Sequence, residues 1–172
     1  MCIFITSNYN RNYKGKDFRL ENDITESGYK FHMNDINATI GIHNFPHIDG
    51  LLEKNRQNAK YLDEKLKDIE GIQIMNIYGK SSYWLYTIRV LNGKKQEFMD
   101  KMKKANIMVS QVHNRNDINS CVKEYQETLP NLDILEKELV CIPVGWWLEE
   151  KDMRYIMENT IENIKYIQHN CG

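Results

Sequence analysis

The feature that most constrains this fold is a series of apolar residues that recur at helical spacing between residues 48 and 69. Such spacing gives a helix one apolar face, and charged residues such as Glu53 and Lys60 fall on the opposite face. We expect this helix to pack along one side of a sheet. Gly71 is a natural helix stop, and residues 72–78 are typical of a strand. The apolar face consists of Ile48, Leu51, Leu52, Ala59, Leu62, Leu66 and Ile69.

Two different segments precede this helix. Residues 1–27 have few periodic apolar positions and dense charge, which predicts an irregular N-terminal segment. From Asn34 to about Phe45 the composition favours a first helix. Pro46 should end or bend that helix, because proline lacks a backbone donor.

The remainder of the chain predicts a small antiparallel sheet covered by helices, an α+β fold. Residues 83–91 alternate in polarity, which indicates a half-buried strand, and the NGK tract after them is a turn. A short helix follows, and a further strand is expected over 107–113. NLDILEKEL is predicted to be helical and CIPVG extended, before a terminal helix. The inward-facing residues are Trp84, Tyr86, Ile88 and Val90 in the strand, Phe98, Met99 and Met102 in the short helix, and Met153, Ile156, Met157, Thr160, Ile161 and Ile164 in the terminal helix.

Composition narrows the range of functions. At 172 residues and 41% hydrophobic content, the chain suits one globular domain. Its formal net charge of -1 provides no global field for holding nucleic acid or an anionic membrane. The four cysteines are widely spaced without a CxxC pair, which favours reduced thiols over a zinc site. The apolar stretch in the opening MCIFITSNYN is too short for a signal peptide or a membrane-spanning helix. We therefore expect a cytoplasmic protein.

The segment GYKFHMNDINATIG, residues 28–41, holds the first candidate site. Lys30 and His32 stand directly before a helix start, where backbone amides also attract an anion, so they could contact a phosphate. The alternative is structural: Tyr29 and Phe31 pack, and Lys30 is solvated.

VSQVHNRND, residues 109–117, holds the second candidate site at the end of a predicted strand. His113 could donate to a substrate hydroxyl or phosphate, and Arg115 could clamp a phosphate or carboxylate in bidentate fashion. The alternative is an internal ion pair between Arg115 and Asp117 that closes the loop.

Other residues favour structural interpretations. Trp146 or Trp147 could stack on a sugar or base, although tryptophans more commonly seal a core or an interface. His43 and His47 lie four residues apart, but Pro46 spoils the helical register that a metal pair needs, so they are interpreted as surface residues. The sequence has no Walker loop and no GxSxG or HExxH motif, and spacing alone defines no catalytic residue and no metal site.

These segments, taken in order from about Gly28 to Ile164, resemble the C-terminal part of the DegT/DnrJ/EryC1/StrS family of sugar-nucleotide aminotransferases. The similarity rests on GYKFHMNDINATIG, KNRQNAKYLDEKL, SSYWLYTIRV, the histidine of VSQVH, and LVCIPVGWW. The resemblance implies that residues 28–172 form the small C-terminal domain of a fold-type-I aminotransferase, after an N-terminal segment, 1–27, that is partly extraneous.

The resemblance also implies a function. The complete enzyme would use pyridoxal phosphate to transfer an amino group from glutamate to a nucleotide-linked keto sugar. Its Schiff-base lysine would belong to a segment upstream of Met1, so this chain alone is expected to bind no cofactor and to be inactive. A homodimer or a separate large-domain chain is the implied partner. The alternative is a non-catalytic module for dimerisation or nucleotide-sugar binding.

Site residues follow from the same resemblance. The family's loop reads glycine-tyrosine-asparagine-tyrosine-arginine where this chain has residues 28–32, and it reaches the cofactor phosphate and substrate of the neighbouring subunit. Lys30 and His32 occupy the asparagine and arginine positions, so they are the implied cofactor contacts. Tyr29, His113 and Arg115 are the implied substrate contacts.

Overall fold

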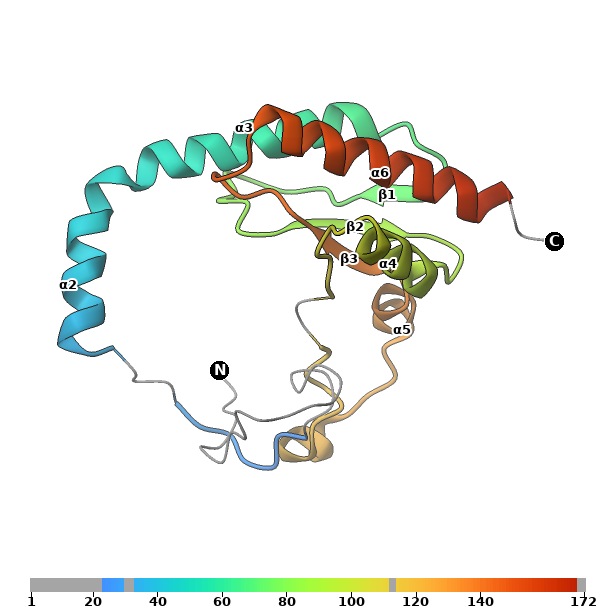
Figure 1. Cartoon of the computed structure of the whole chain (residues 1–172). Coiled ribbons are helices and arrows are strands. Elements are labelled where there is room, and N and C mark those ends of the chain that lie inside the picture. Colours follow the sequence, from blue (N-terminus) through green and yellow to red (C-terminus); the bar gives the residue numbers. More distant parts are fainter. Residues whose placement is uncertain (1–22, 30–32, 112–113, 170–172) are drawn as a thin grey trace.

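The computed structural model describes residues 23–29, 33–111 and 114–169, and it has an α+β fold (Figure 1). A small antiparallel sheet is covered by helices, as the sequence predicts. Within the described residues, no helix combines the length and apolarity needed to cross a bilayer. The elements are α2 (Asp35–Asn44), η1 (Phe45–His47), α3 (Ile48–Leu66), β1 (Ile72–Ile74), β2 (Tyr86–Val90), α4 (Lys95–Lys104), η2 (Ser120–Tyr125), α5 (Pro130–Glu136), β3 (Leu139–Ile142) and α6 (Glu150–His169).

The bend between α2 and α3 has a local cause. The side chain of Asn34 caps α2 by accepting a hydrogen bond of 2.9 Å from the backbone amide of Asn37. Pro46 lies in the short η1 helix that separates α2 from α3, so the predicted break is confirmed. In Figure 1, α2 turns away from the rest of the molecule at this point.

The sheet has the strand order β1-β2-β3 with both pairs antiparallel. Ile88 of β2 lies opposite Ile74 on one side and Val140 on the other. The face that carries Tyr86, Ile88 and Val90 is buried, as the alternation predicts.

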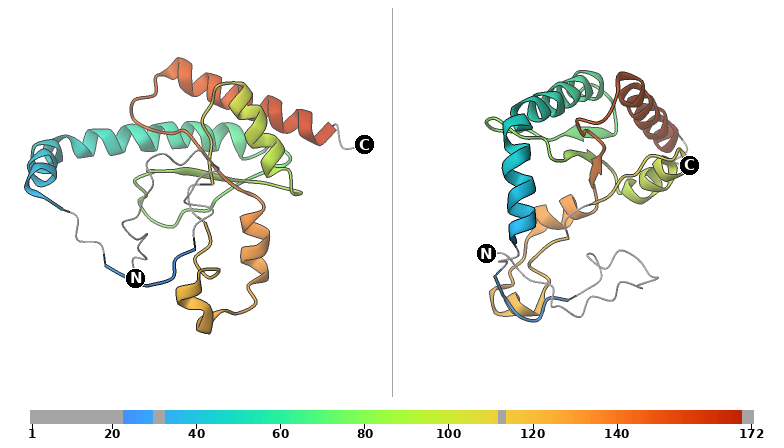
Figure 2. Two further views of the ribbon diagram at one scale, coloured as in Figure 1. Left: turned by 60° about the horizontal axis from the view of Figure 1, so that its bottom comes forward. Right: turned by 60° about the vertical axis from the view of Figure 1, so that its left-hand side comes forward.

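The core lies between this face of the sheet and three helices. Figures 1 and 2 show α3 and α6 side by side above the strands, with α4 next to α6. Leu62 and Leu66 of α3 and Ile164 of α6 are fully buried in one cluster. Phe98 and Met102 of α4 also contribute to this cluster, as the predicted inward faces require.

Three predicted strands differ from the structure. Of the strand expected over 72–78, only Ile72–Ile74 forms β1, and Met75, Ile77 and Tyr78 are exposed. Residues 107–109 are irregular, and in the described part of 107–113 pairing is limited to a single bridge between Ser110 and Cys141. Ile107 is nevertheless buried in the core, so its apolar character serves packing without a ladder of backbone hydrogen bonds. At the start of the strand predicted over 83–91, Trp84 is exposed because β2 begins only at Tyr86.

Candidate functional site

The two predicted site segments are tied together at their bases by hydrogen bonds. The backbone amide of Ile24 donates to Oδ1 of Asn119 at 3.1 Å, and the amide of Cys121 donates to the carbonyl of Ile24 at 3.0 Å. Asp23 accepts from the amide and the hydroxyl of Ser120, at 2.8 and 2.5 Å. We call these contacts of residues 23–24 with residues 119–121 the loop clamp. In Figure 1 the blue segment 23–29 accordingly lies beside η2.

The loop clamp is polar and partly buried. Asn119 is a buried polar residue, and its amide nitrogen donates to the carbonyl of Asn116 at 3.0 Å. Hydrogen bonds from the hydroxyl and the amide of Ser120 hold the pKa of Asp23 below its ordinary value. The clamp therefore holds residues 23–24, just before the predicted loop at 28, against residues 119–121, just after the segment that contains Arg115.

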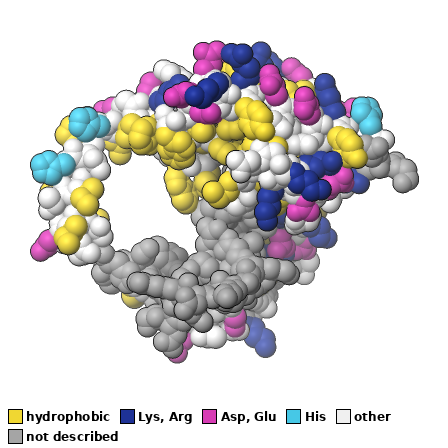
Figure 3. All heavy atoms as spheres, in the orientation of Figure 1, with side chains coloured by type: hydrophobic (Ala, Val, Ile, Leu, Met, Phe, Trp, Pro, Cys, Tyr) yellow, Lys and Arg dark blue, Asp and Glu magenta, His cyan; other side chains and the backbone are white. Residues whose placement is uncertain are grey.

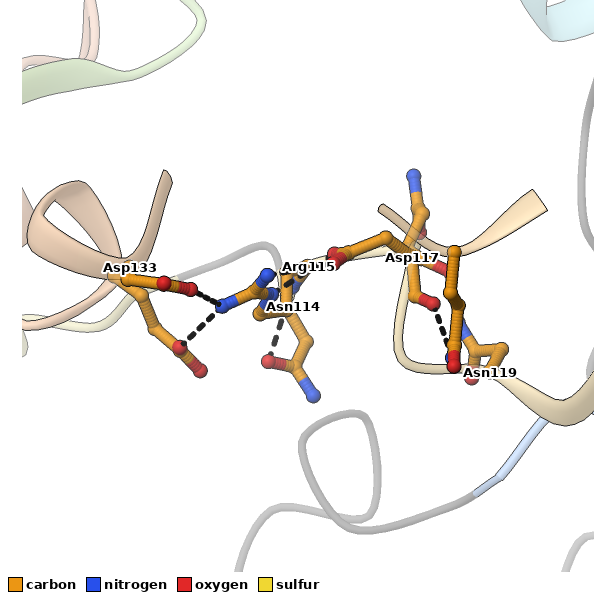
Figure 4. Close-up of polar contacts among 8 residues, drawn as sticks. Asn114, Arg115, Asp117, Asn119 and Asp133 are labelled. Carbon is orange, nitrogen blue, oxygen red and sulfur yellow. Dashed lines mark hydrogen bonds and ion pairs between the residues drawn. The ribbon is translucent and has the colours of Figure 1, made fainter. Parts of the chain in front are cut away.

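Arg115 is held by three carboxylates (Figure 4). Its Nε and one terminal nitrogen donate to the two oxygens of Asp117 at 2.9 and 2.5 Å. The other terminal nitrogen donates to Asp133 at 2.5 Å and to Glu136 at 3.4 Å, both on α5. Hydrogen bonds to Asp117 and Asp133 raise the pKa of Arg115. The structure thus contains the internal ion pair that was one of the two interpretations, extended to α5.

This network limits what Arg115 can do chemically. A bidentate clamp on a phosphate or carboxylate needs two free donors, whereas here Asp117 occupies one fork of the guanidinium. An anion would have to displace a carboxylate of the same sign. The geometry therefore favours Arg115 as the residue that holds the loop against α5.

The other predicted site residues are placed only in part. Tyr29 is exposed and lies five residues after Ile24 of the loop clamp. Lys30, His32 and His113 lie outside the described residues. Sequence reasoning missed the clamp, because its partners stand 95 and 97 residues apart and carry no local motif.

Two of the three tryptophans, Trp84 and Trp147, line an apolar cavity of about 800 Å³. Trp146 and Trp147 are 49% and 65% exposed, so they do not seal the core of this chain. They form an edge-to-face pair at 5.9 Å, and Trp147 lines the cavity with Trp84 and Tyr155. His43 and His47 are exposed, as predicted, and no group of metal ligands occurs within the described residues.

This cavity does not fit pyridoxal phosphate. The cofactor requires a lysine for its aldehyde and cationic or amide donors for its phosphate. No lysine or arginine is among the described residues that line the cavity, and its charged group is the carboxylate of Asp152. Lys95 is partly buried elsewhere, where it donates to Gln111 and to the carbonyl of Glu136, each at 2.5 Å.

Comparison with known proteins gives the family. The model of the DegT/DnrJ/EryC1/StrS aminotransferase family matches residues 4–160. This chain belongs to that family. The match begins within residues 1–27, ahead of the start of the small domain predicted at Gly28.

Relatives are similar over most of this chain. UDP-4-amino-4,6-dideoxy-N-acetyl-beta-L-altrosamine transaminase of Campylobacter jejuni is 26% identical over 161 residues, which cover 88% of this chain and 43% of the relative. The sugar aminotransferase CalS13 from Micromonospora echinospora has 36% identity and a TM-score of 0.70, covering 81% of this chain and 38% of CalS13. E coli GDP-4-keto-6-deoxy-D-mannose-3-dehydratase with bound hydrated pyridoxal phosphate shares the fold, with 18% identity and a TM-score of 0.67, covering 77% of this chain and 36% of the enzyme.

Two facts follow from these comparisons. The chain spans less than half the length of each of these relatives. Pyridoxal phosphate dependence is a property of the family to which the chain belongs.

Proposed function

We propose that this chain is the C-terminal small domain of a pyridoxal-phosphate-dependent sugar-nucleotide aminotransferase, and that it completes a substrate pocket whose other side belongs to a large domain. The family match over residues 4–160 and the 38% coverage of CalS13 support this proposal. The reaction is amino transfer from glutamate to a nucleotide-linked keto sugar. The large domain supplies the lysine that carries the cofactor, so the chain alone is inactive.

The loop clamp is the observation that carries the proposal. It joins two segments that are far apart in sequence: Asp23–Ile24, four residues before the predicted site loop at 28, and Asn119–Cys121, two residues after the segment that ends at 117. Substrate-positioning groups must be held within a fraction of an ångström of their working geometry. A polar clamp at the base of both loops serves that purpose.

Each site residue has a role in this proposal. Lys30 and His32 donate to the cofactor phosphate across the interface, and Tyr29 and His113 contact the sugar nucleotide. Arg115, held by Asp117 and α5, acts as a positioning residue for the His113 segment. A homodimer, or a partner chain that carries the large domain, assembles the complete site.

Reconstitution tests the proposal. The part of CalS13 outside the match is produced as a separate chain with pyridoxal phosphate, and the 172-residue chain is added. Amination of a keto sugar nucleotide with glutamate as donor is then measured. We expect the rate to rise on addition of the chain, and to fall when Asn119→Leu removes the acceptor for the Ile24 amide.

Two controls make the outcome decisive. Asn159→Ala removes an exposed hydrogen bond within α6, away from the clamp, and should leave the rate unchanged. Incubation of the isolated chain with pyridoxal phosphate and borohydride should trap no specific adduct. A trapped adduct with matching turnover, or no gain in rate from the mixture, would contradict the proposal.

The apolar cavity favours a second candidate function, a non-catalytic nucleotide-sugar-binding module. Exposed indoles such as Trp84 and Trp147 could stack on a base or a sugar ring. Titration of the isolated chain with a UDP-linked sugar, followed by tryptophan fluorescence, tests this function. Saturable quenching that Trp147→Ala abolishes would support the module, and a flat titration would exclude it.

A further inference from the structure

The helix α2 carries large apolar side chains that this chain does not cover. Ile36, Ile40, Ile42 and Phe45, at its C-terminal end, are 54% to 72% exposed, and α2 has no buried residue. Figure 3 shows hydrophobic side chains along α2, which bounds an open hollow on one side, and further hydrophobic side chains on the α3 side of the same hollow. Isolated exposed apolar residues are common, but a contiguous set marks an interface.

The apolar residues of α2 lie on two opposite faces. At about 100° per residue, Ile36 and Ile40 fall within about 40° of each other, whereas Ile42 and Phe45 point to the other side. A helix with large apolar side chains on opposite faces, as here, is typical of an environment that contacts it from more than one direction. Contact on one face would leave the second pair of side chains in water.

The length of α2 strengthens this argument. A helix of 10 residues is only marginally stable by itself in water, and the Asn34 cap adds a modest local contribution. Helices of this length depend on tertiary packing, and α2 has no such packing within the described chain.

The relatives indicate what covers α2. The match takes in 38% of CalS13, so about three fifths of that fold lies outside it. A two-fold contact between two copies of α2 would bury the same face of each helix and leave the opposite face exposed. Enclosure from both sides therefore favours the part of the fold that lies outside the match over a second copy.

We propose that the large domain of the aminotransferase, in this chain's partner or in its own longer form, encloses α2 on both the Ile36–Ile40 face and the Ile42–Phe45 face. This inference rests on the proposed function, because it takes the large domain as the occupant. It assigns to α2 the role of the main docking element, directly after the loop that carries Lys30 and His32.

A binding experiment tests this inference without any readout of activity. The probe is the part of CalS13 outside the match, and the dissociation constant of its complex with the 172-residue chain is measured by calorimetry. The matching segment of CalS13 itself, which must bind its own remainder, validates the probe. Ile40→Asp and Ile42→Asp should each weaken binding by about tenfold or more, since each places a charge in an apolar contact.

Matched controls separate docking from folding. Tyr125→Asp changes an equally exposed apolar residue on η2, outside α2, and should bind like the unaltered chain. Circular dichroism should show that the α2 variants keep the fold, because no α2 side chain belongs to the buried core. Amide exchange of residues 35–44 should slow on complex formation.

The outcomes distinguish this inference from the proposed function. Binding that both α2 variants weaken, without amination in the mixture, supports the inference and refutes the function. Amination or binding that neither variant affects overturns the inference, as does sensitivity to one face alone. A dimer of the isolated chain that Ile40→Asp disrupts and that persists when the probe is added would identify a second copy as the occupant, and would also overturn it.

Discussion

Tyr86 donates a hydrogen bond of 2.6 Å to Oδ1 of Asp63, and this contact joins the central strand β2 to helix α3. Tyr86 is buried, and Tyr83 stacks near it with ring centroids 6.4 Å apart. We predict that Tyr86→Phe lowers the free energy of unfolding by about 1–2 kcal/mol, because Asp63 loses its donor while the ring packing is kept. Urea unfolding measures the change, and Tyr83→Phe, which keeps this bond, should have a smaller effect.

The same contact predicts a loss of stability at alkaline pH. Burial, and then the hydrogen bond to Asp63, raise the pKa of Tyr86 above its ordinary value of about 10. The unfolded chain releases this proton at lower pH than the folded chain does, so the contribution to stability is complete below about pH 10 and falls as pH rises further. Unfolding midpoints between about pH 8 and pH 11 should show a shallower decline for Tyr86→Phe than for the unaltered chain. Parallel declines would contradict this assignment.

The hydrogen bonds of Asn58 should also contribute to the stability of the fold. The Asn58 amide nitrogen is buried and donates to the carbonyls of Val144 and Gly145, each at 3.1 Å, so it links α3 to the turn before α6. Asn58→Leu should cost about 1–3 kcal/mol of unfolding free energy, since the Val144 carbonyl loses this donor and the Gly145 carbonyl keeps only the amide of Leu148. Thermal unfolding measures this cost. Asn159→Ala, at an exposed position on α6, serves as the control and should change it little.

The ion pairs of Arg115 should make the thermal stability of the fold depend on pH in the acidic range. The hydrogen bonds of Arg115 hold the pKa of Asp117 below the ordinary value, so this contribution to stability is present above the ordinary carboxyl pKa and is lost as pH falls through the folded-state pKa. Arg115→Leu should lower the thermal midpoint at neutral pH and reduce its decline on acidification. Arg115→Lys should restore part of the midpoint, because lysine keeps the charge but cannot form the bidentate pair. Equal midpoints for both variants would contradict the network's role.

Replacing Gly71 should lower the stability of the fold, and the same replacement at Gly79 separates the backbone cost from the cost of a side-chain contact. The φ of Gly71 is +87°, and an added Cβ would lie 2.1 Å from Nε2 of Gln168 on α6. Gly71→Ala should cost about 1–2 kcal/mol for the left-handed backbone, with a further cost for the contact. Gly79 has a φ of +86° with nothing within 4 Å, so Gly79→Ala carries the backbone cost alone. If calorimetry gives the same loss for both, the contact with Gln168 is unimportant.

Local signals predicted the helices of this fold well. The break at Pro46 depends on neighbouring residues and is present. The predicted apolar face of α3 is buried at Ala59, Leu62 and Leu66, whereas Ile48 at its start is exposed. The strand predicted over 107–113 failed because β propensity does not provide a pairing partner, and here only Ser110 meets β3. Sequence-based signals therefore succeeded where neighbouring residues alone determine the structure, and failed where a strand needs a partner distant in sequence.

The contacts of the candidate site were harder to predict from the sequence, because they too join residues that are far apart in the chain. The two interpretations of Arg115 could not be separated, because Asp133 and Glu136 stand 18 and 21 residues away from it. The loop clamp depends on Asp23 and Ser120, which are 97 residues apart. The predicted contacts of Lys30, His32 and His113 stay predictions.

The independence of α2 from the buried core implies an order of assembly. Among the described residues, every side chain of that core belongs to α3 or to residues after it, so the sheet and its covering helices can reach their native packing first. Helix α2 would then be the last element to become stably packed, when the proposed large domain binds it. With the large domain as the occupant that we propose, chain made in excess of that domain would expose the apolar side chains of α2 to chaperones and proteases, and the amounts of the two would rise and fall together.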